Sequence, residues 1–95
     1  MAREIVSRAP LKDPEGSGNV AAVILVHLTH NRDTPYVTWI EGKDGSTFWG
    51  NYHTFYSEAE PDFKQRCETY KTETPIINPV ALATPMEKDP NDDQA

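Results

Sequence analysis

The pattern of apolar and polar positions predicts a central strand early in the chain. The most apolar segment runs from Asn19 to His30 and is rich in β-branched residues, which favour a strand over a helix. Between Val20 and Val26 both alternating faces are apolar, and one face turns polar only towards His30. A strand apolar on both faces is expected at the centre of a sheet or at an oligomer contact.

Two further strands are predicted downstream. The residues from Tyr36 to Glu41 are β-branched or aromatic until the final acid. Residues 42–45 begin and end with glycine, which suits a hairpin loop. The third strand runs from Ser46 to Tyr52 or His53, and Gly50 within it indicates a β-bulge or space for a large ring.

One helix is predicted between the third strand and Pro75. Ser57-Glu58-Ala59-Glu60 matches a capping box with Ser57 as N-cap, while Pro61 also suits the first position of a helix, so two starts are open. Apolar residues at i, i+4 and i+7 form a single stripe that faces the sheet: Phe63, Cys67 and Tyr70.

These elements predict an α+β fold in which one C-terminal helix packs a three-stranded antiparallel β-meander. Residues 19–73 form the folded domain. Prolines and glycines predict that residues 1–18 are a flexible arm, with an edge strand over residues 3–7 as the alternative, and further prolines make residues 74–86 an extended strap. Residues 87–95 are expected to be an acidic disordered tail.

Composition and charge limit the classes of function. A chain of 95 residues has room for one small domain. Its net charge of −6 disfavours binding to phosphate backbones or anionic lipid, although half of that charge lies in residues 87–95. The apolar run from Val20 to Val26 is much shorter than the ~20 residues of a membrane span. The lone Cys67 and the absence of a secretory leader predict a cytoplasmic protein.

The histidines first suggest a zinc site. His27 and His53 share one face of the predicted sheet, but His30 joins them only through a turn. No second cysteine supports metal binding, so we interpret them as ordinary sheet histidines and expect no metal or cofactor. Cys67 lies on the apolar stripe of the helix, as a structural thiol would. No phosphate loop, dinucleotide motif or nucleophile elbow is present, and we expect no enzymatic activity.

Aromatic residues are the most distinctive feature. Seven of the nine aromatic residues fall within residues 36–56. A single helix covers only one face of a sheet, so rings on the other face are exposed, or are covered by the strap or by a partner. Five residues form the candidate binding surface: Tyr36, Trp39, Trp49, Tyr52 and His53.

Three short motifs carry a resemblance to other proteins. They are Tyr36-Val37-Thr38-Trp39, Phe48-Trp49-Gly50-Asn51-Tyr52 and Asp62-Phe63-Lys64-Gln65-Arg66. In this order the chain resembles small uncharacterised bacterial and phage proteins in which a Trp-Gly-x-Tyr strand precedes an Asp-Phe-x-x-Arg helix. The resemblance covers roughly residues 34–67. It implies a ββα core and no activity.

The leading hypothesis is a non-enzymatic protein-interaction module that forms a homodimer through the strand from Val20 to Val26. One alternative is a sheet that binds single-stranded nucleic acid by stacking bases on Trp39, Trp49 and Tyr52. Another is an acidic inhibitor that offers carboxylates in place of phosphates to a basic partner.

Overall fold

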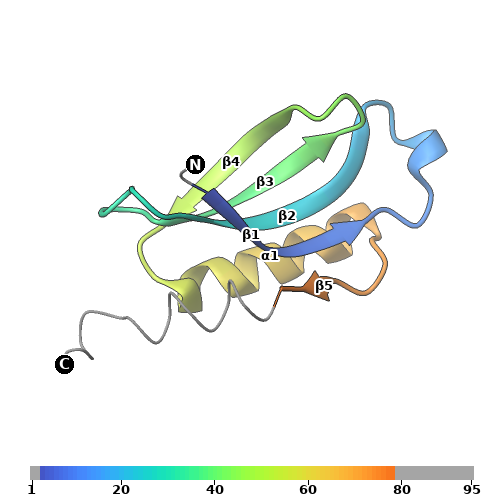
Figure 1. The fold of residues 1–95 in the computed structure, drawn as a ribbon. Coiled ribbons are helices and arrows are strands. Elements are labelled where there is room, and N and C mark those ends of the chain that lie inside the picture. Colours follow the sequence, from blue (N-terminus) through green and yellow to red (C-terminus); the bar gives the residue numbers. More distant parts are fainter. Residues whose placement is uncertain (1–2, 79–95) are drawn as a thin grey trace.

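The structure, a computed structural model, describes residues 3–78 as an antiparallel sheet with one α-helix on one face (Figure 1). The five strands lie in the order β4-β3-β2-β1-β5. Their bounds are β1 Arg3–Pro10, β2 Val20–Leu28, β3 Tyr36–Gly42, β4 Thr47–His53 and β5 Ile76–Ile77. Helix α1 spans Tyr56–Tyr70, and a short 3-10 helix, η1, spans Pro14–Gly16. The predicted α+β class is confirmed, but the sheet has five strands and is not a three-stranded meander.

Strand β1 corrects the prediction of a flexible arm over residues 1–18. It pairs antiparallel with β2 along the register from Arg3↔Leu28 to Pro10↔Ala22. The prediction was wrong because the residues that disfavour regular structure begin only at Pro10, where the strand ends. Val6 and Ala9 are fully buried in the core, and their burial stabilises the strand.

Strand β5 was also missed. Ile77 and Ile76 pair with Ser7 and Arg8 of β1, at the outer edge of the sheet. The described part of the predicted strap therefore extends the sheet sideways. The rest of the strap (79–86) and the acidic tail (87–95) lie outside the described residues.

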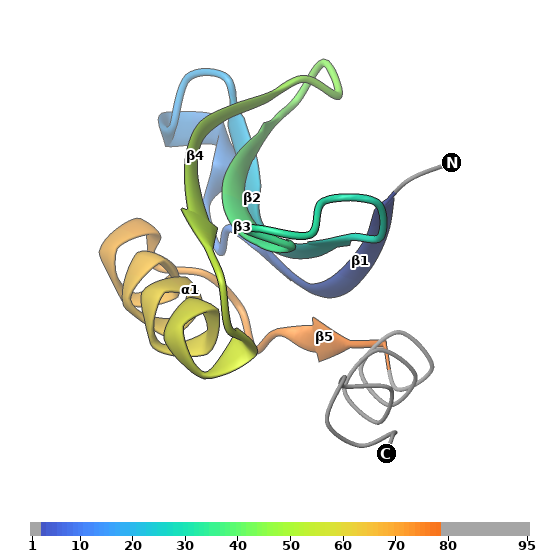
Figure 2. The same cartoon turned by 90° about the vertical axis from the view of Figure 1, so that its left-hand side faces the viewer.

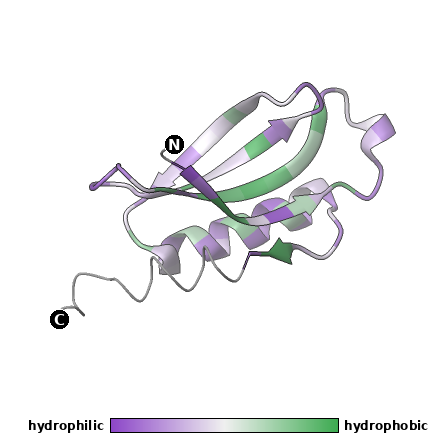
Figure 3. Ribbon diagram, viewed as in Figure 1, coloured by the Kyte–Doolittle hydropathy of each residue, from purple (hydrophilic) through white to green (hydrophobic). Residues whose placement is uncertain are grey.

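Strand β2 is central, which explains its two apolar faces. On one face Val23 and Leu25 pack in the core that contains α1, and on the other Ile24 and Val26 pack with Val37. Figure 3 shows β2 as a long hydrophobic band. Both edges of β2 are hydrogen-bonded, to β1 and to β3, so no free edge remains for a strand-to-strand dimer through Val20–Val26.

Helix α1 lies against one face of the curved sheet (Figure 2). It starts at Tyr56 after the N-cap Phe55 and has no side-chain cap, so neither predicted start is correct. Pro61 lies inside the helix beyond its first turn, so the helix lacks the hydrogen bond that an N–H at this position would donate to the carbonyl of Ser57. Lys71 ends the helix in a left-handed conformation. The predicted stripe is confirmed, since Phe63 is buried in the core with Cys67 and Tyr70 packed against it.

Candidate functional site

The sheet divides the predicted surface residues between its two faces. Tyr36 and His53 are cross-strand partners on the face covered by α1. Trp39 and Tyr52 lie on the opposite face, which we call the helix-free face. Trp49 lies between them in sequence, on edge strand β4, at an irregularity of the sheet. The five residues therefore do not form one surface.

The irregularity is a β-bulge. Thr38 pairs with Asn51, but Ile40 pairs with Phe48, so Trp39 faces both Trp49 and Gly50. Trp49 adopts a left-handed backbone conformation with φ of 57°. For a residue with a bulky side chain this conformation costs about 1–2 kcal/mol. Strain of this kind persists where the surrounding structure enforces it, and it is concentrated at functional sites.

Gly50 provides the space that the Trp39 indole occupies. A Cβ atom at position 50 would lie 2.5 Å from Nε1 and 2.8 Å from Cδ1 of Trp39. The indole also meets the ring of Tyr52 edge-on, at 6.2 Å between centroids and 88° between planes. Both predicted reasons for Gly50, a bulge and space for a ring, are confirmed.

Three exposed aromatic side chains lie on β4 or just after it. The exposed fractions are 64% for Trp49, 50% for Tyr52 and 60% for Phe55. We call these three residues the aromatic edge. β4 is the last strand on its side of the sheet, so its outer edge has no strand partner among the described residues. Phe55 was not predicted as a surface residue, because nothing in the sequence distinguishes it from the rings that pack on the core.

The Trp49 side chain contacts the core through Phe48. Its ring meets that of Phe48 edge-on, with centroids 5.0 Å apart and planes at 87°. Phe48 in turn packs against the buried cluster beneath α1. This contact holds the indole in place while most of it remains exposed.

Strand β1 adds positive charge to the helix-free face. The Arg3 guanidinium lies 5.3 Å from the ring centroid of Trp39, a cation–π contact. Arg8 Nε donates to Glu41 Oε1 over 2.7 Å. The sequence could not place these arginines beside the aromatic residues while residues 1–18 were expected to be a flexible arm.

A polar cluster joins α1 to β3 and β4 on the other face. The Thr38 hydroxyl donates to Asp62 Oδ2 over 2.6 Å, and His53 Nε2 lies 2.9 Å from the same oxygen. The Asn51 amide donates to both carboxylate oxygens at 3.3 and 3.2 Å. Arg66 Nε lies 3.9 Å from Oδ1. Burial opposes ionisation of Asp62, but these hydrogen bonds outweigh burial and lower its pKa.

This cluster holds the helix on the sheet. Thr38 is fully buried, and its hydroxyl donates to the Asp62 carboxylate. This hydroxyl is therefore not available to attack a substrate. Cys67 is half-buried on the same helix, and burial raises the pKa of its thiol. A nucleophilic cysteine needs the opposite shift. The arrangement supports a structural role for Asp62.

The structure does not bring His27 and His53 into contact. Tyr36 pairs with His27 on one side and with His53 on the other, so it separates the two on the sheet. The ring of His27 is tilted against that of Tyr36 at 5.2 Å. Among residues 3–78 no group of three or more His, Cys, Asp or Glu side chains is arranged to hold a metal ion.

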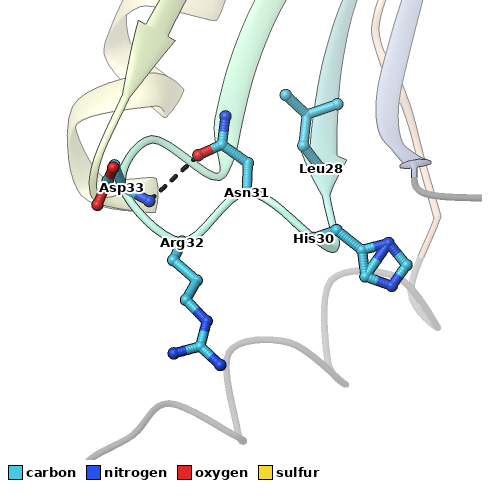
Figure 4. A pocket seen from close by; sticks show the side chains of 5 residues that line it. All are labelled: Leu28, His30, Asn31, Arg32 and Asp33. Atoms are coloured by element: carbon cyan, nitrogen blue, oxygen red, sulfur yellow. Dashed lines mark hydrogen bonds between the residues drawn. The ribbon is translucent and has the colours of Figure 1, made fainter.

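A shallow pocket of about 570 Å³ lies at the turn between β2 and β3. Its lining residues are Leu28, His30, Asn31, Arg32 and Asp33. Figure 4 shows that the side chains of His30 and Arg32 diverge. Asn31 Oδ1 accepts hydrogen bonds from the backbone of Asp33 and Thr34 and so closes the turn on itself. A binding site needs convergent polar groups, and this pocket has none.

No protein-family model, curated protein or solved structure matches this chain. The described part of the chain also contains no helix with the length and hydropathy needed to cross a membrane.

Proposed function

We propose that this protein is a non-enzymatic protein-interaction module that binds its partner through the aromatic edge. The observation that carries the proposal is Trp49, a bulky side chain held in a strained left-handed conformation and 64% exposed on an edge strand. A residue selected only for packing would be buried or would be replaced by glycine at this φ.

The chemistry of the edge fits a protein partner. Trp and Tyr are enriched among the few interface residues whose truncation weakens binding by about 2 kcal/mol or more. The side chains of Trp49, Tyr52 and Phe55 combine large apolar area with few rotatable bonds, so little conformational entropy is lost on binding. Trp39 is a positioning residue in this proposal, because its indole packs over Gly50 within the bulge.

Two residues of the predicted surface do not enter the proposal. Tyr36 packs against the core beneath α1, and its ring meets that of Tyr56 edge-on at 5.7 Å. His53 is engaged with Asp62. Both lie on the face that α1 covers.

Site-specific photo-crosslinking tests the proposal. The full chain would carry a photoreactive phenylalanine analogue at position 49, or at position 55 in a second variant, and would be irradiated in a lysate of its native cells. We expect discrete protein adducts from both positions. The matched control carries the analogue at Ile77, which is 54% exposed on the opposite edge of the sheet.

Two outcomes contradict the proposal. One is the absence of any protein adduct, including adducts between copies of the chain, from positions 49 and 55. The other is an identical adduct pattern from position 77, which would indicate that exposed apolar residues react without selectivity.

The second candidate is binding of single-stranded nucleic acid on the helix-free face. It is favoured by Arg3 and Arg8, which bring two positive charges to the side of the sheet where Trp39 and Tyr52 lie. Saturable quenching of Trp fluorescence by short oligonucleotides, weakening as salt rises, would support it.

We place this candidate second for geometric reasons. The guanidinium of Arg3 already occupies the neighbourhood of the Trp39 ring, where a base would stack. Arg8 is neutralised by Glu41 at 2.7 Å. The chain as a whole carries a net charge of −6, which repels phosphate.

A further inference from the structure

We infer that the partner of the aromatic edge is a second copy of this chain, so that two β4 edges meet about a two-fold axis near Gly50 and Asn51. This inference rests on the proposed function and names the occupant of the same surface. In such a pair, Trp49 of each copy lies beside Tyr52 of the other.

Charge along β4 does not oppose a second copy. Each chain carries −6, so two copies repel as whole molecules and can meet only at a surface without like charges. The segment from Thr47 to Tyr52 contains no acidic or basic residue. The acid nearest to this strand on β3, Glu41, is paired with Arg8 at 2.7 Å. Asp62, which faces β4 from α1, is held by Thr38, Asn51 and His53.

The bulge argues against an extended peptide as the occupant. A peptide that adds a strand to a sheet gains its affinity from an unbroken row of backbone hydrogen bonds. The left-handed conformation of Trp49 interrupts that row in the middle of β4, and bulges are a common protection of edges against strand addition. The same interruption keeps the two β4 backbones of a dimer from pairing as strands. Affinity at this edge must therefore come from side chains, and a two-fold pair presents the aromatic edge twice.

The available area fits a weak dimer. Aromatic side chains each carry roughly 200 Å² of surface, so exposed fractions of 64%, 50% and 60% leave roughly 350 Å² per copy to be covered. A standard stable interface needs about 800 Å² per partner. The three rings supply close to half of that, and the neighbouring β4 residues add to it. We therefore expect a dimer that dissociates on dilution.

Sedimentation equilibrium of the purified full chain tests this inference, at concentrations from about 5 µM to about 500 µM. We expect a mass near 10.7 kDa at the lowest concentration and a rise towards twice that value. Trp49→Asn removes the indole while asparagine tolerates the left-handed backbone. It is expected to weaken dimerisation at least ~10-fold, a loss within the range of an interface hot spot.

Two further variants separate loss of the contact from loss of the fold. Tyr52→Lys places a charge on the same edge and should also give a monomer. Ile77→Lys is the matched control on β5 and should leave the dimerisation constant unchanged within about twofold. Far-UV circular dichroism checks that each variant is folded.

A second signal comes from Trp49 itself. The chain has two tryptophans, so the emission that the natural chain shows and Trp49→Asn lacks belongs to Trp49. Its emission should move to shorter wavelength as concentration rises, because the indole leaves water when the dimer forms.

Three results overturn the inference. They are a monomer at every concentration, a dimer that survives both Trp49→Asn and Tyr52→Lys, and a dimer that is lost in Ile77→Lys. If the purified chain is monomeric while position 49 still crosslinks to another protein, the homodimer is wrong and the proposed function stands. If no protein is crosslinked either, both fail.

Discussion

The indole of Trp39 lies where any side chain at Gly50 would begin, with its Nε1 atom 2.5 Å from the Cβ position. This relationship ties two features of β4 together. The bulge brings Gly50 opposite Trp39, and the same bulge forces Trp49 into the left-handed region. The exposed side chain of Trp49 and the close approach of the Trp39 indole to Gly50 are therefore consequences of one local rearrangement of the strand.

Gly50→Ala is expected to destabilise the fold by about 1–3 kcal/mol, because the added methyl group overlaps the Trp39 indole and the backbone or the ring must shift. The free energy of unfolding from urea titration, followed by circular dichroism, measures the effect.

The matched control is the same substitution in a Trp39→Leu background. Without the indole the methyl group has room, so Gly50→Ala should be nearly neutral there. Additive effects of the two substitutions would contradict the proposed overlap.

Trp49→Asn is expected to keep or raise the stability of the monomer, by up to about 1 kcal/mol, because the left-handed backbone suits asparagine better than tryptophan. Urea titration at low protein concentration measures it without a contribution from association. A clear loss of stability would mean that the contact with Phe48 outweighs the strain. The comparison variant Trp49→Phe keeps both a ring and the strain, and should be close to the natural chain.

The local pattern of apolar and polar residues predicts three of the five strands. β2, β3 and β4 all begin and end within about two residues of their predicted limits, since alternation and β-branched residues reflect burial directly. β1 and β5 cannot be predicted from the local pattern. β5 pairs with a strand about 70 positions away, as in Ser7↔Ile77, and β1 pairs with β2 across the loop that holds η1, as in Arg3↔Leu28. Neither segment has a strong periodic pattern of its own.

The sequence predicts only part of the candidate site. Side-chain parity along β4 separates Tyr52 from His53, but the parity of Trp49 changes at the bulge, which depends on pairing with Trp39. The Asp62 cluster draws on β3, β4 and α1 together. Hydrogen bonds between elements distant in sequence leave no signal in one sequence taken alone.

Asp62→Ala is expected to cost about 2–4 kcal/mol, because it removes the acceptor for Thr38, Asn51 and His53 and leaves a buried hydroxyl without its partner. Chemical unfolding at neutral pH measures the loss. Glu68→Ala serves as the control, because Glu68 is exposed on the same helix. Equal effects of the two substitutions would contradict the structural role of the cluster.

The pH dependence of the Asp62 contribution follows from its lowered pKa. A carboxyl group whose pKa is lower in the folded state stabilises the fold above its unfolded value of 3.8, and this contribution is lost as the pH falls below 3.8. The difference in unfolding free energy between the natural chain and Asp62→Asn should therefore shrink on acidification through this range. A constant difference would show that the charge of Asp62 has no part in the stabilisation.

His27 gives a second, separate pH effect. Burial lowers the pKa of its imidazole below 6.5, against the opposing influence of Glu4, whose Oε1 lies 3.9 Å from Nδ1. Below pH 6.5 the unfolded chain therefore binds a proton more readily than the folded one, and stability falls as the pH drops from 6.5 towards the folded pKa.

His27→Phe isolates this effect, because it keeps a ring against Tyr36 at a position where the natural rings are 5.2 Å apart. Urea titrations at about pH 7.5 and about pH 5 should show a larger loss of stability for the natural chain than for the variant. The two proteins differ only at position 27, so pH effects common to both cancel in the comparison. Parallel losses in the two proteins would mean that protonation of His27 is not resisted by the fold, and that its ring is hydrated where the structure has it half-buried.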